Sequence, residues 1–260
     1  MTELLYGSIA INLSSRFSVK CINVFLLAAL FFMVTGCSHP VGRERPINPR
    51  TLSREHARPK IVIDAGHGGK DFGAASKTTP VALEKTLNLN TALMLNTYLQ
   101  KMGYQTILTR GADFFVPLDL RAAIANSNDA VLFVSVHYNS APNARAEGVE
   151  VYYYDSKDNK KRTEESKILA NTVLLQILDA TKSKSRGIKH GNFAVIRETS
   201  MPAILIEGGF ITNENEVLRM RSNAYLKTLA ESIAIGIDDF LKGSGKKERP
   251  RRDSNARPAA

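Results

Sequence analysis

The segment Ile61-Val62-Ile63-Asp64-Ala65-Gly66-His67-Gly68-Gly69 joins a run of β-branched residues to a turn rich in glycine. Its first three residues are all apolar, with no alternation, which predicts a strand buried on both faces, as in a parallel sheet. The glycines allow the backbone to bend sharply, so that His67 points into a cleft at the end of the strand. The segment therefore predicts a fold class and a place for a functional site.

Strands and helices alternate along the rest of the chain. Further apolar, β-branched runs occupy residues 105–108, 130–136, 149–154, 194–196 and 203–206. Helical patterns lie between most of them: one begins with Thr79 as N-cap and Pro80 as first residue and stops at Gly103, and others cover residues 117–126, 162–180 and 223–241. We predict an α/β fold, a single doubly wound and mostly parallel sheet of about six strands with helices on both faces. The loop before residue 149 is too short for a helical crossover, so the sheet is expected to be mixed.

Composition excludes several classes of protein. The chain has 260 residues, of which 43% are hydrophobic, and two cysteines. These values exclude a mostly disordered chain and a small protein framed by disulfides. The formal charge of +10 suggests a nucleic-acid-binding protein, but residues 61–241 carry 20 basic and 20 acidic side chains. The basic excess lies in the flanking segments, and we expect no nucleic-acid partner.

The N-terminal segment has the pattern of an export signal. Arg16 and Lys20 precede an apolar run over residues 24–34, which is too short to span a bilayer that needs about 20 apolar residues. Residues 34–37 (Val-Thr-Gly-Cys) resemble a bacterial lipoprotein signal, which implies that residues 1–36 are removed and that Cys37 carries lipid. An ordinary signal peptide with an incidental cysteine is the alternative.

Two flanking segments surround the predicted domain. Residues 37–60 are rich in arginine and proline and are expected to form a tether, whereas residues 61–242 form the folded domain. Residues 243–260 are basic and punctuated by glycine, serine and proline, which predicts a disordered tail. The tail either keeps the protein soluble or contacts an anionic surface of the cell envelope.

Three potential catalytic residues follow three of the apolar runs. His67 follows residues 61–63, His137 follows the run that ends at residue 136, and Glu207 follows residues 203–206. Ligands of doubly wound sheets bind beyond the carboxyl ends of the strands, so these side chains are expected to lie together. Glu84 lies in the first turn or two of the helix that follows the loop of His67. Two imidazoles, one ligating carboxylate and a second, free carboxylate are the inventory of a catalytic zinc site.

Four blocks of sequence carry a family resemblance. They are residues 61–74, the helix start at Glu84, residues 121–139 and residues 193–213. In this order they resemble the zinc-dependent N-acetylmuramoyl-L-alanine amidases, bacterial cell-wall hydrolases of the autolysin and cell-separation type. The resemblance covers about residues 60–241. Tyr138 and Gly208 stand where other residues are common in the family.

The resemblance implies a reaction and a role for each site residue. His67, Glu84 and His137 would hold one zinc ion that activates water, and Glu207 would act as general base. The bond cut would be the amide between the lactyl group of N-acetylmuramic acid and L-alanine in peptidoglycan. Arg197 is a candidate for binding a substrate carboxylate. Three neighbours of the motifs are candidates for supporting the ligands: Asp64, Ser135 and Asn139.

The resemblance of residues 34–37 to a lipoprotein signal also implies a location. Two other functions remain open for the folded domain. Ser38 rather than aspartate follows Cys37, which favours a periplasmic protein anchored to the outer membrane. A zinc peptidase that cuts within the stem peptide is the first alternative, because the same chemistry attacks any amide. An inactive wall-binding lipoprotein is the second, although the intact set of four site residues argues against it.

Overall fold

The structure is a computed structural model that describes residues 58–247. The predicted signal over residues 1–36 and the predicted lipidation site at Cys37 lie outside the described residues, as do most of the tether and of the tail. None of the helices within residues 58–247 has both the length and the apolar character that a bilayer crossing requires.

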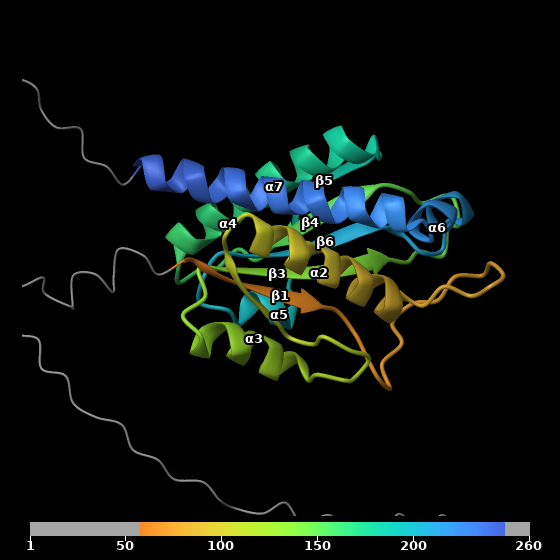
Figure 1. Cartoon of the computed structure of the whole chain (residues 1–260), viewed down its shortest axis with the longest axis horizontal. Helices are drawn as coiled ribbons and strands as arrows, with labels where there is room; N and C mark the ends of the chain where they lie inside the picture. Colours follow the sequence, from red (N-terminus) through yellow and green to blue (C-terminus); the bar gives the residue numbers. More distant parts are fainter. Residues whose placement is uncertain (1–57, 248–260) are drawn as a thin grey trace, which may run out of the picture. The chain divides into compact units, whose positions relative to one another are not determined.

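A single six-stranded sheet forms the centre of the domain (Figure 1). The strand order is β2-β1-β3-β6-β4-β5, in which β2, β1, β3 and β6 run parallel and β4 runs antiparallel to β6. The strand bounds are Lys60–Ala65 (β1), Gln105–Leu108 (β2), Leu132–Asn139 (β3), Val149–Tyr153 (β4), Ser185–His190 (β5) and Ala203–Phe210 (β6). The prediction of one mixed, mostly parallel sheet is confirmed.

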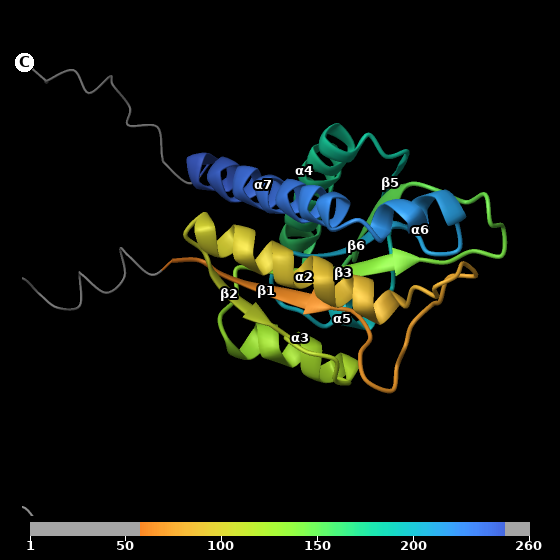
Figure 2. The same ribbon diagram turned by 45° about the vertical axis from the view of Figure 1, so that its right-hand side comes forward.

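Helices cover both faces of the sheet (Figure 2). Helices α2, α4 and α7 pack together on one face, and α3 and α5 pack on the other. The helix bounds are Glu84–Lys101 (α2), Leu118–Ser127 (α3), Lys160–Thr181 (α4), Ala194–Arg197 (α5), Glu214–Met220 (α6) and Asn223–Lys247 (α7). The doubly wound arrangement follows from the alternation of strands and helices in the sequence.

The first strand shows why its residues are all apolar. Ile61 and Ile63 belong to the larger core layer under α2, α4 and α7, whereas Val62 faces the smaller layer under α3 and α5. All three side chains are fully buried. Because both faces of β1 are covered, an alternating pattern of polar and apolar residues would place polar groups in a core.

One predicted strand is wrong in kind, and one strand was not predicted. Residues 194–196, predicted as a strand, form the short helix α5, and the sixth strand is β5 over residues to which no element was assigned. A run of three apolar residues does not distinguish a strand from a buried helical turn. Strand β5 lies at the edge of the sheet and is mostly polar, so it carries no hydrophobic signal.

Two helix ends also differ from the prediction. Helix α2 begins at Glu84, because the preceding residues form a loop in which the backbone N–H groups of Ser76 and Glu84 donate to the carbonyls of Ala82 and Ala74. This later start makes Glu84 the first residue of the helix, where the helix dipole favours a carboxylate. Helix α7 continues to Lys247, beyond its predicted end at residue 241.

Candidate metal centre

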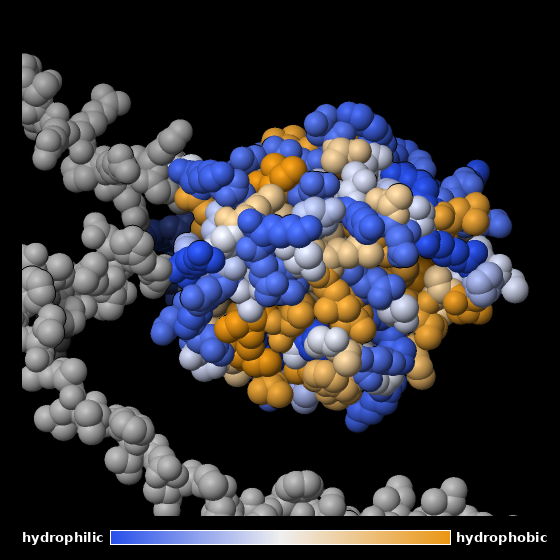
Figure 3. Space-filling model, in the orientation of Figure 1, coloured by the Kyte–Doolittle hydropathy of each residue, from blue (hydrophilic) through white to orange (hydrophobic). Residues whose placement is uncertain are grey.

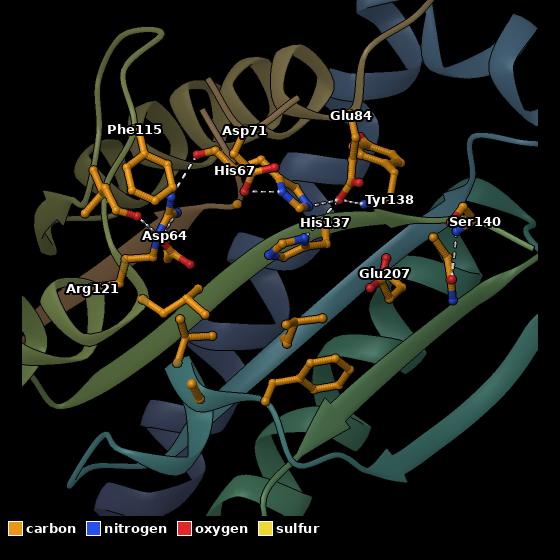
Figure 4. A pocket seen from close by; sticks show the side chains of 18 residues that line it. Asp64, His67, Asp71, Glu84, Phe115, Arg121, His137, Tyr138, Ser140 and Glu207 are labelled. Atoms are coloured by element: carbon orange, nitrogen blue, oxygen red, sulfur yellow. Dashed lines mark hydrogen bonds and ion pairs between the residues drawn. The ribbon is translucent and has the colours of Figure 1, made fainter. Parts of the chain in front are cut away.

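Three side chains of metal-ligand type meet at one end of the sheet. His67 lies in the loop after β1, Glu84 opens α2, and His137 lies on β3. Glu84 Oε1 is 3.1 Å from His67 Nε2 and 2.9 Å from His137 Nδ1, and one ligand atom from each residue lies within 4.8 Å of the others. Figure 4 shows the three side chains turned toward one another. A tetrahedral zinc ion places its ligand atoms about 3.4 Å apart, so small side-chain adjustments accommodate one.

The backbone of the glycine-rich loop places His67. His67 has a φ of +60°, in the left-handed region that residues with a side chain rarely adopt. Gly66 precedes it at a point of close approach, where an added Cβ would stand 2.1 Å from His137 Cε1. The loop therefore needs glycine at position 66 to bring the two imidazoles together.

The buried Arg110 joins the segments that carry two of the candidate ligands. Its Nη2 donates to the carbonyl of Gly66 at 2.7 Å and to the carbonyl of Lys85 at 2.9 Å. These carbonyls adjoin His67 and Glu84 in the chain, and the Arg110 side chain is fully buried. Charge-assisted hydrogen bonds from one rigid guanidinium thus fix the loop relative to the start of α2.

A second buried arginine holds the same loop from the other side. Arg121 donates to Asp64 Oδ1 at 2.8 Å and to the carbonyl of His67 at 2.8 Å. Ser135 donates its hydroxyl to the other carboxylate oxygen of Asp64 at 2.7 Å. Asp64 and Ser135 therefore support the candidate ligand through Arg121, without touching it.

Glu84 is a buried carboxylate that is held in its charged form. Its Oε2 accepts the backbone N–H of Ala74 at 2.8 Å, and a Cβ at Gly73 would stand 2.5 Å from the same oxygen. Burial by itself raises the pKa of Glu84, but the hydrogen bonds of His137 and His67 outweigh burial and hold that pKa far below its ordinary value. A permanently ionised carboxylate suits a cation ligand.

Asp71 orients the ring of His67. The Nδ1 of His67 lies 2.8 Å from Asp71 Oδ2, on the side of the ring opposite the one that faces Glu84. Burial opposes protonation of His67, yet the neighbouring carboxylates of Glu84 and Asp71 raise its pKa above the ordinary value. A carboxylate on the far nitrogen of an imidazole is the usual partner of a metal-ligating histidine, because it fixes the tautomer.

Glu207 stands beside the cluster without belonging to it. It lies on β6 directly opposite His137 on β3, and both side chains face the same cavity (Figure 4). Its Oε2 is buried and accepts no hydrogen bond from the residues that the structure describes. Burial, with the negative charges of Glu84 and Glu150, raises the pKa of Glu207 well above its ordinary value.

The cluster opens into a cavity of about 530 Å³. Polar residues of its lining include the cluster and Glu207. Apolar residues of its lining include Phe115, Val116, Leu118, Phe193, Ala194 and Val195. Figure 3 shows further hydrophobic side chains gathered at the surface over α3. The site thus combines a polar, charged floor with an apolar wall.

The predicted site residues do not all lie in this cavity. The structure brings together the four side chains predicted for metal and proton chemistry. Arg197 lies on α5, where it donates to Asn192 Oδ1 and to Glu198 Oε1, each at 2.8 Å, and it does not line the cavity. Asn139 lines the cavity and donates to Glu150.

Sequence reasoning missed three residues of the site: Asp71, Arg110 and Glu150. Asp71 lies four residues after His67 in the same motif, and that spacing was an available signal. No local signal marked Arg110 or Glu150, because their contacts join segments far apart in the chain.

Comparisons with known proteins agree on one family. The family model described as N-acetylmuramoyl-L-alanine amidase matches residues 61–239. The sporulation-specific N-acetylmuramoyl-L-alanine amidase of Bacillus subtilis is 35% identical over 181 residues, which are 69% of this chain and 67% of that protein. The crystal structure of an N-acetylmuramoyl-L-alanine amidase from Clostridium difficile 630 superposes with a TM-score of 0.68 at 39% identity and covers 72% of this chain and 99% of its own. The catalytic domain of CwlV, an amidase from Paenibacillus polymyxa var. colistinus, gives a TM-score of 0.65 at 38% identity, with 71% of this chain and 98% of its own covered.

Proposed function

The chain belongs to the N-acetylmuramoyl-L-alanine amidase family, and we propose that it cleaves the amide between the lactyl group of N-acetylmuramic acid and L-alanine in peptidoglycan. The observation that carries the proposal is the cluster of His67, Glu84 and His137 beside the free carboxylate of Glu207. A ligand set and a separate proton acceptor in one cavity are the parts of a site for metal-assisted hydrolysis of an unactivated amide.

We assign His67, Glu84 and His137 as the ligands of one zinc ion. Two imidazole nitrogens and a carboxylate oxygen form a known donor set of catalytic zinc. The remaining polar atoms also fit, since Asp71 holds the far nitrogen of His67 and the N–H of Ala74 holds the second oxygen of Glu84. When bound, zinc polarises a carbonyl oxygen and lowers the pKa of water from about 15.7 to about 7.

Glu207 is the group assigned to proton transfer. Its carboxylate accepts a proton from the attacking water as the water oxygen bonds to the amide carbon. It then gives that proton to the nitrogen of alanine, so that the C–N bond breaks with a neutral amine as leaving group. The pKa of Glu207 is raised by its buried position, which matches a base that works near neutral pH and later acts as an acid.

Digestion of purified peptidoglycan tests this assignment. An amidase releases intact stem peptides with a free N-terminal alanine and leaves unsubstituted glycan strands, both of which mass spectrometry identifies. Shortened stems on substituted glycans would instead identify the zinc peptidase, and no change in either would identify a binding protein. Glu207→Gln protein is the matched control, because it keeps the assigned ligands and loses the assigned base.

We also propose that lipid on Cys37 anchors the protein in the cell envelope, on the periplasmic side of the outer membrane. The support is the lipoprotein-like sequence over residues 34–37, followed by Ser38. The tether over residues 37–60 then carries the catalytic domain away from the membrane, and the basic tail over residues 243–260 meets an anionic envelope surface. Cys37→Ala should move the protein from the membrane fraction to the soluble fraction. Unchanged fractionation would contradict the anchor.

A further inference from the structure

The polar floor of the site continues across the sheet to Glu150. Glu150 on β4 lies directly opposite Glu207 on β6, which lies opposite His137 on β3. Residues in register on neighbouring strands project from the same face, so the three side chains form one row. Glu150 is only 2% exposed and is therefore a buried charge that requires partners.

Two cations on the edge strand β5 share this one carboxylate. Arg186 Nε lies 2.9 Å from Glu150 Oε2, and Lys189 Nζ lies 2.5 Å from the same oxygen. Among the described residues, neither cation has an ion pair with another carboxylate. Two positive charges against one negative charge leave a local excess of one. Side chains that are 36% and 38% exposed present this excess to solvent.

The basic pair borders the cavity through two contacts. Asn139, which lines the cavity, donates to Glu150 Oε1 at 2.6 Å. Phe193 also lines the cavity, and its ring packs edge-on against Tyr152 with the centroids 5.0 Å apart. Lys189 Nζ lies 5.9 Å from the centroid of the Tyr152 ring. The cavity wall and the basic pair are therefore continuous.

The separation of the pair from the reacting centre matches the length of a short peptide. Strand β5 is two strands away from β6, which is about 10 Å at the usual strand spacing. An extended peptide advances about 3.3–3.6 Å per residue. A group that reaches the pair from an amide beside Glu207 thus lies two to three residues along the peptide.

We propose that Arg186 and Lys189 bind a carboxylate of the stem peptide, two to three residues beyond the scissile amide. This inference rests on the proposed function and adds the direction in which the substrate lies. The N-acetylated glycan carries no charge for the pair, whereas the peptide carries carboxylates that accept charge-assisted hydrogen bonds. The peptide therefore runs over β4 and β5, and the glycan lies toward β1 and toward Phe115 and Leu118, the part of the apolar wall farther from the basic pair.

The test compares two substrates that differ only in charge. One is a synthetic N-acetylmuramoyl tripeptide with free carboxylates, and the other is the same compound with those carboxylates converted to carboxamides. We expect the zinc-loaded wild-type protein to cleave the charged compound with a kcat/KM about tenfold or more above that of the neutral one. Arg186→Gln and Lys189→Gln should each lower kcat/KM for the charged compound by about tenfold and change it less than about twofold for the neutral one. Each single variant leaves Glu150 one cation, so the buried charge keeps a partner.

Lys184→Gln is the matched control, because it removes the same charge from the residue immediately before β5, a lysine that pairs with Glu147 instead of Glu150. It should leave the ratio between the two substrates unchanged. Equal losses on both substrates in the Arg186 and Lys189 variants would assign the pair a structural role and overturn the inference. Equal wild-type rates on both substrates would overturn it as well, whereas cleavage of neither compound would count against the proposed function itself.

Discussion

His137 and Glu207 occupy directly paired positions on the neighbouring parallel strands β3 and β6. The imidazole of His137, one of the three candidate metal ligands, therefore projects beside the free carboxylate of Glu207. The strands fix this pairing through backbone hydrogen bonds, independently of any ion. The side chain at position 207, the proposed base, therefore stays in place when a substitution removes its proton chemistry. This relationship separates metal binding from proton transfer and allows each to be tested alone.

Glu207→Gln should abolish turnover and keep the metal. The amide fills the same space but does not accept a proton, and removal of a general base typically lowers kcat by about 10²–10⁴-fold. Elemental analysis should still find one zinc ion per chain. His67→Ala serves as the contrasting variant and should lose both metal and activity. A Glu207→Gln protein that keeps more than about a tenth of the wild-type rate would remove Glu207 from the mechanism.

The same substitution should stabilise the metal-free protein at neutral pH. The raised pKa of Glu207 means that folding disfavours its charged form, so this residue reduces stability as the pH rises above the ordinary glutamate value of about 4.3. Glutamine carries no such penalty. In the presence of a chelator, Glu207→Gln should melt at least about 2 °C above wild type at pH 7 and close to wild type at pH 4. An equal difference in Tm at both pH values would contradict this account.

Asp71→Asn should weaken metal binding while leaving the fold intact. The asparagine oxygen still accepts a hydrogen bond from His67 Nδ1, but the negative charge that increases the basicity of the ring is lost. Loss of such a partner typically lowers metal affinity about 10–100-fold. Competition with a chelating dye measures the affinity. Asp119→Asn, an exposed aspartate on α3, is the control and should bind zinc like wild type.

Substitutions at Tyr138 and Gly208 should have coupled effects on the free energy of unfolding. An added Cβ at Gly208 would stand 3.0 Å from the buried ring of Tyr138, so the tyrosine occupies the space that a side chain at position 208 would need. Gly208→Ala should cost about 1–3 kcal/mol of unfolding free energy through overpacking. With Tyr138→Ala in the background, the same change should cost at least about 0.5 kcal/mol less. Denaturant unfolding of the four proteins measures this coupling, and strictly additive costs would contradict it.

The pairing of Tyr138 with Gly208 also shows what the sequence could and could not predict. Both positions were recognisable as departures from the family pattern, but their contact was not, because it joins two strands. The buried strands β1, β3 and β6 were predictable because a run of consecutive apolar residues indicates a strand that is buried on both faces. The edge strand β5 was not, because its polar residues carry no hydrophobic pattern, and it holds the two cations beside Glu150.

Three of the four central site residues were predictable for a different reason. His67, His137 and Glu207 lie on or just after buried strands, and the parallel order brings such positions to one end of the sheet. The residues that support them were not predictable, because Arg110 acts through backbone carbonyls that have no sequence signature. Arg197 was proposed for the substrate from its motif alone, and the structure gives it neighbours in Asn192 and Glu198 instead.

The three assigned ligands come from a loop, a helix start and a strand, and Glu84 and His137 are 53 residues apart in the chain. An unfolded polypeptide holds these groups too far apart on average to chelate an ion, so the proposed zinc ion would have high affinity for the native state alone. Occupancy and conformational stability are then thermodynamically linked: each tenfold rise of free zinc above its dissociation constant adds about 1.4 kcal/mol to the native state. Metal supply would thus govern how long the enzyme survives as well as how fast it works.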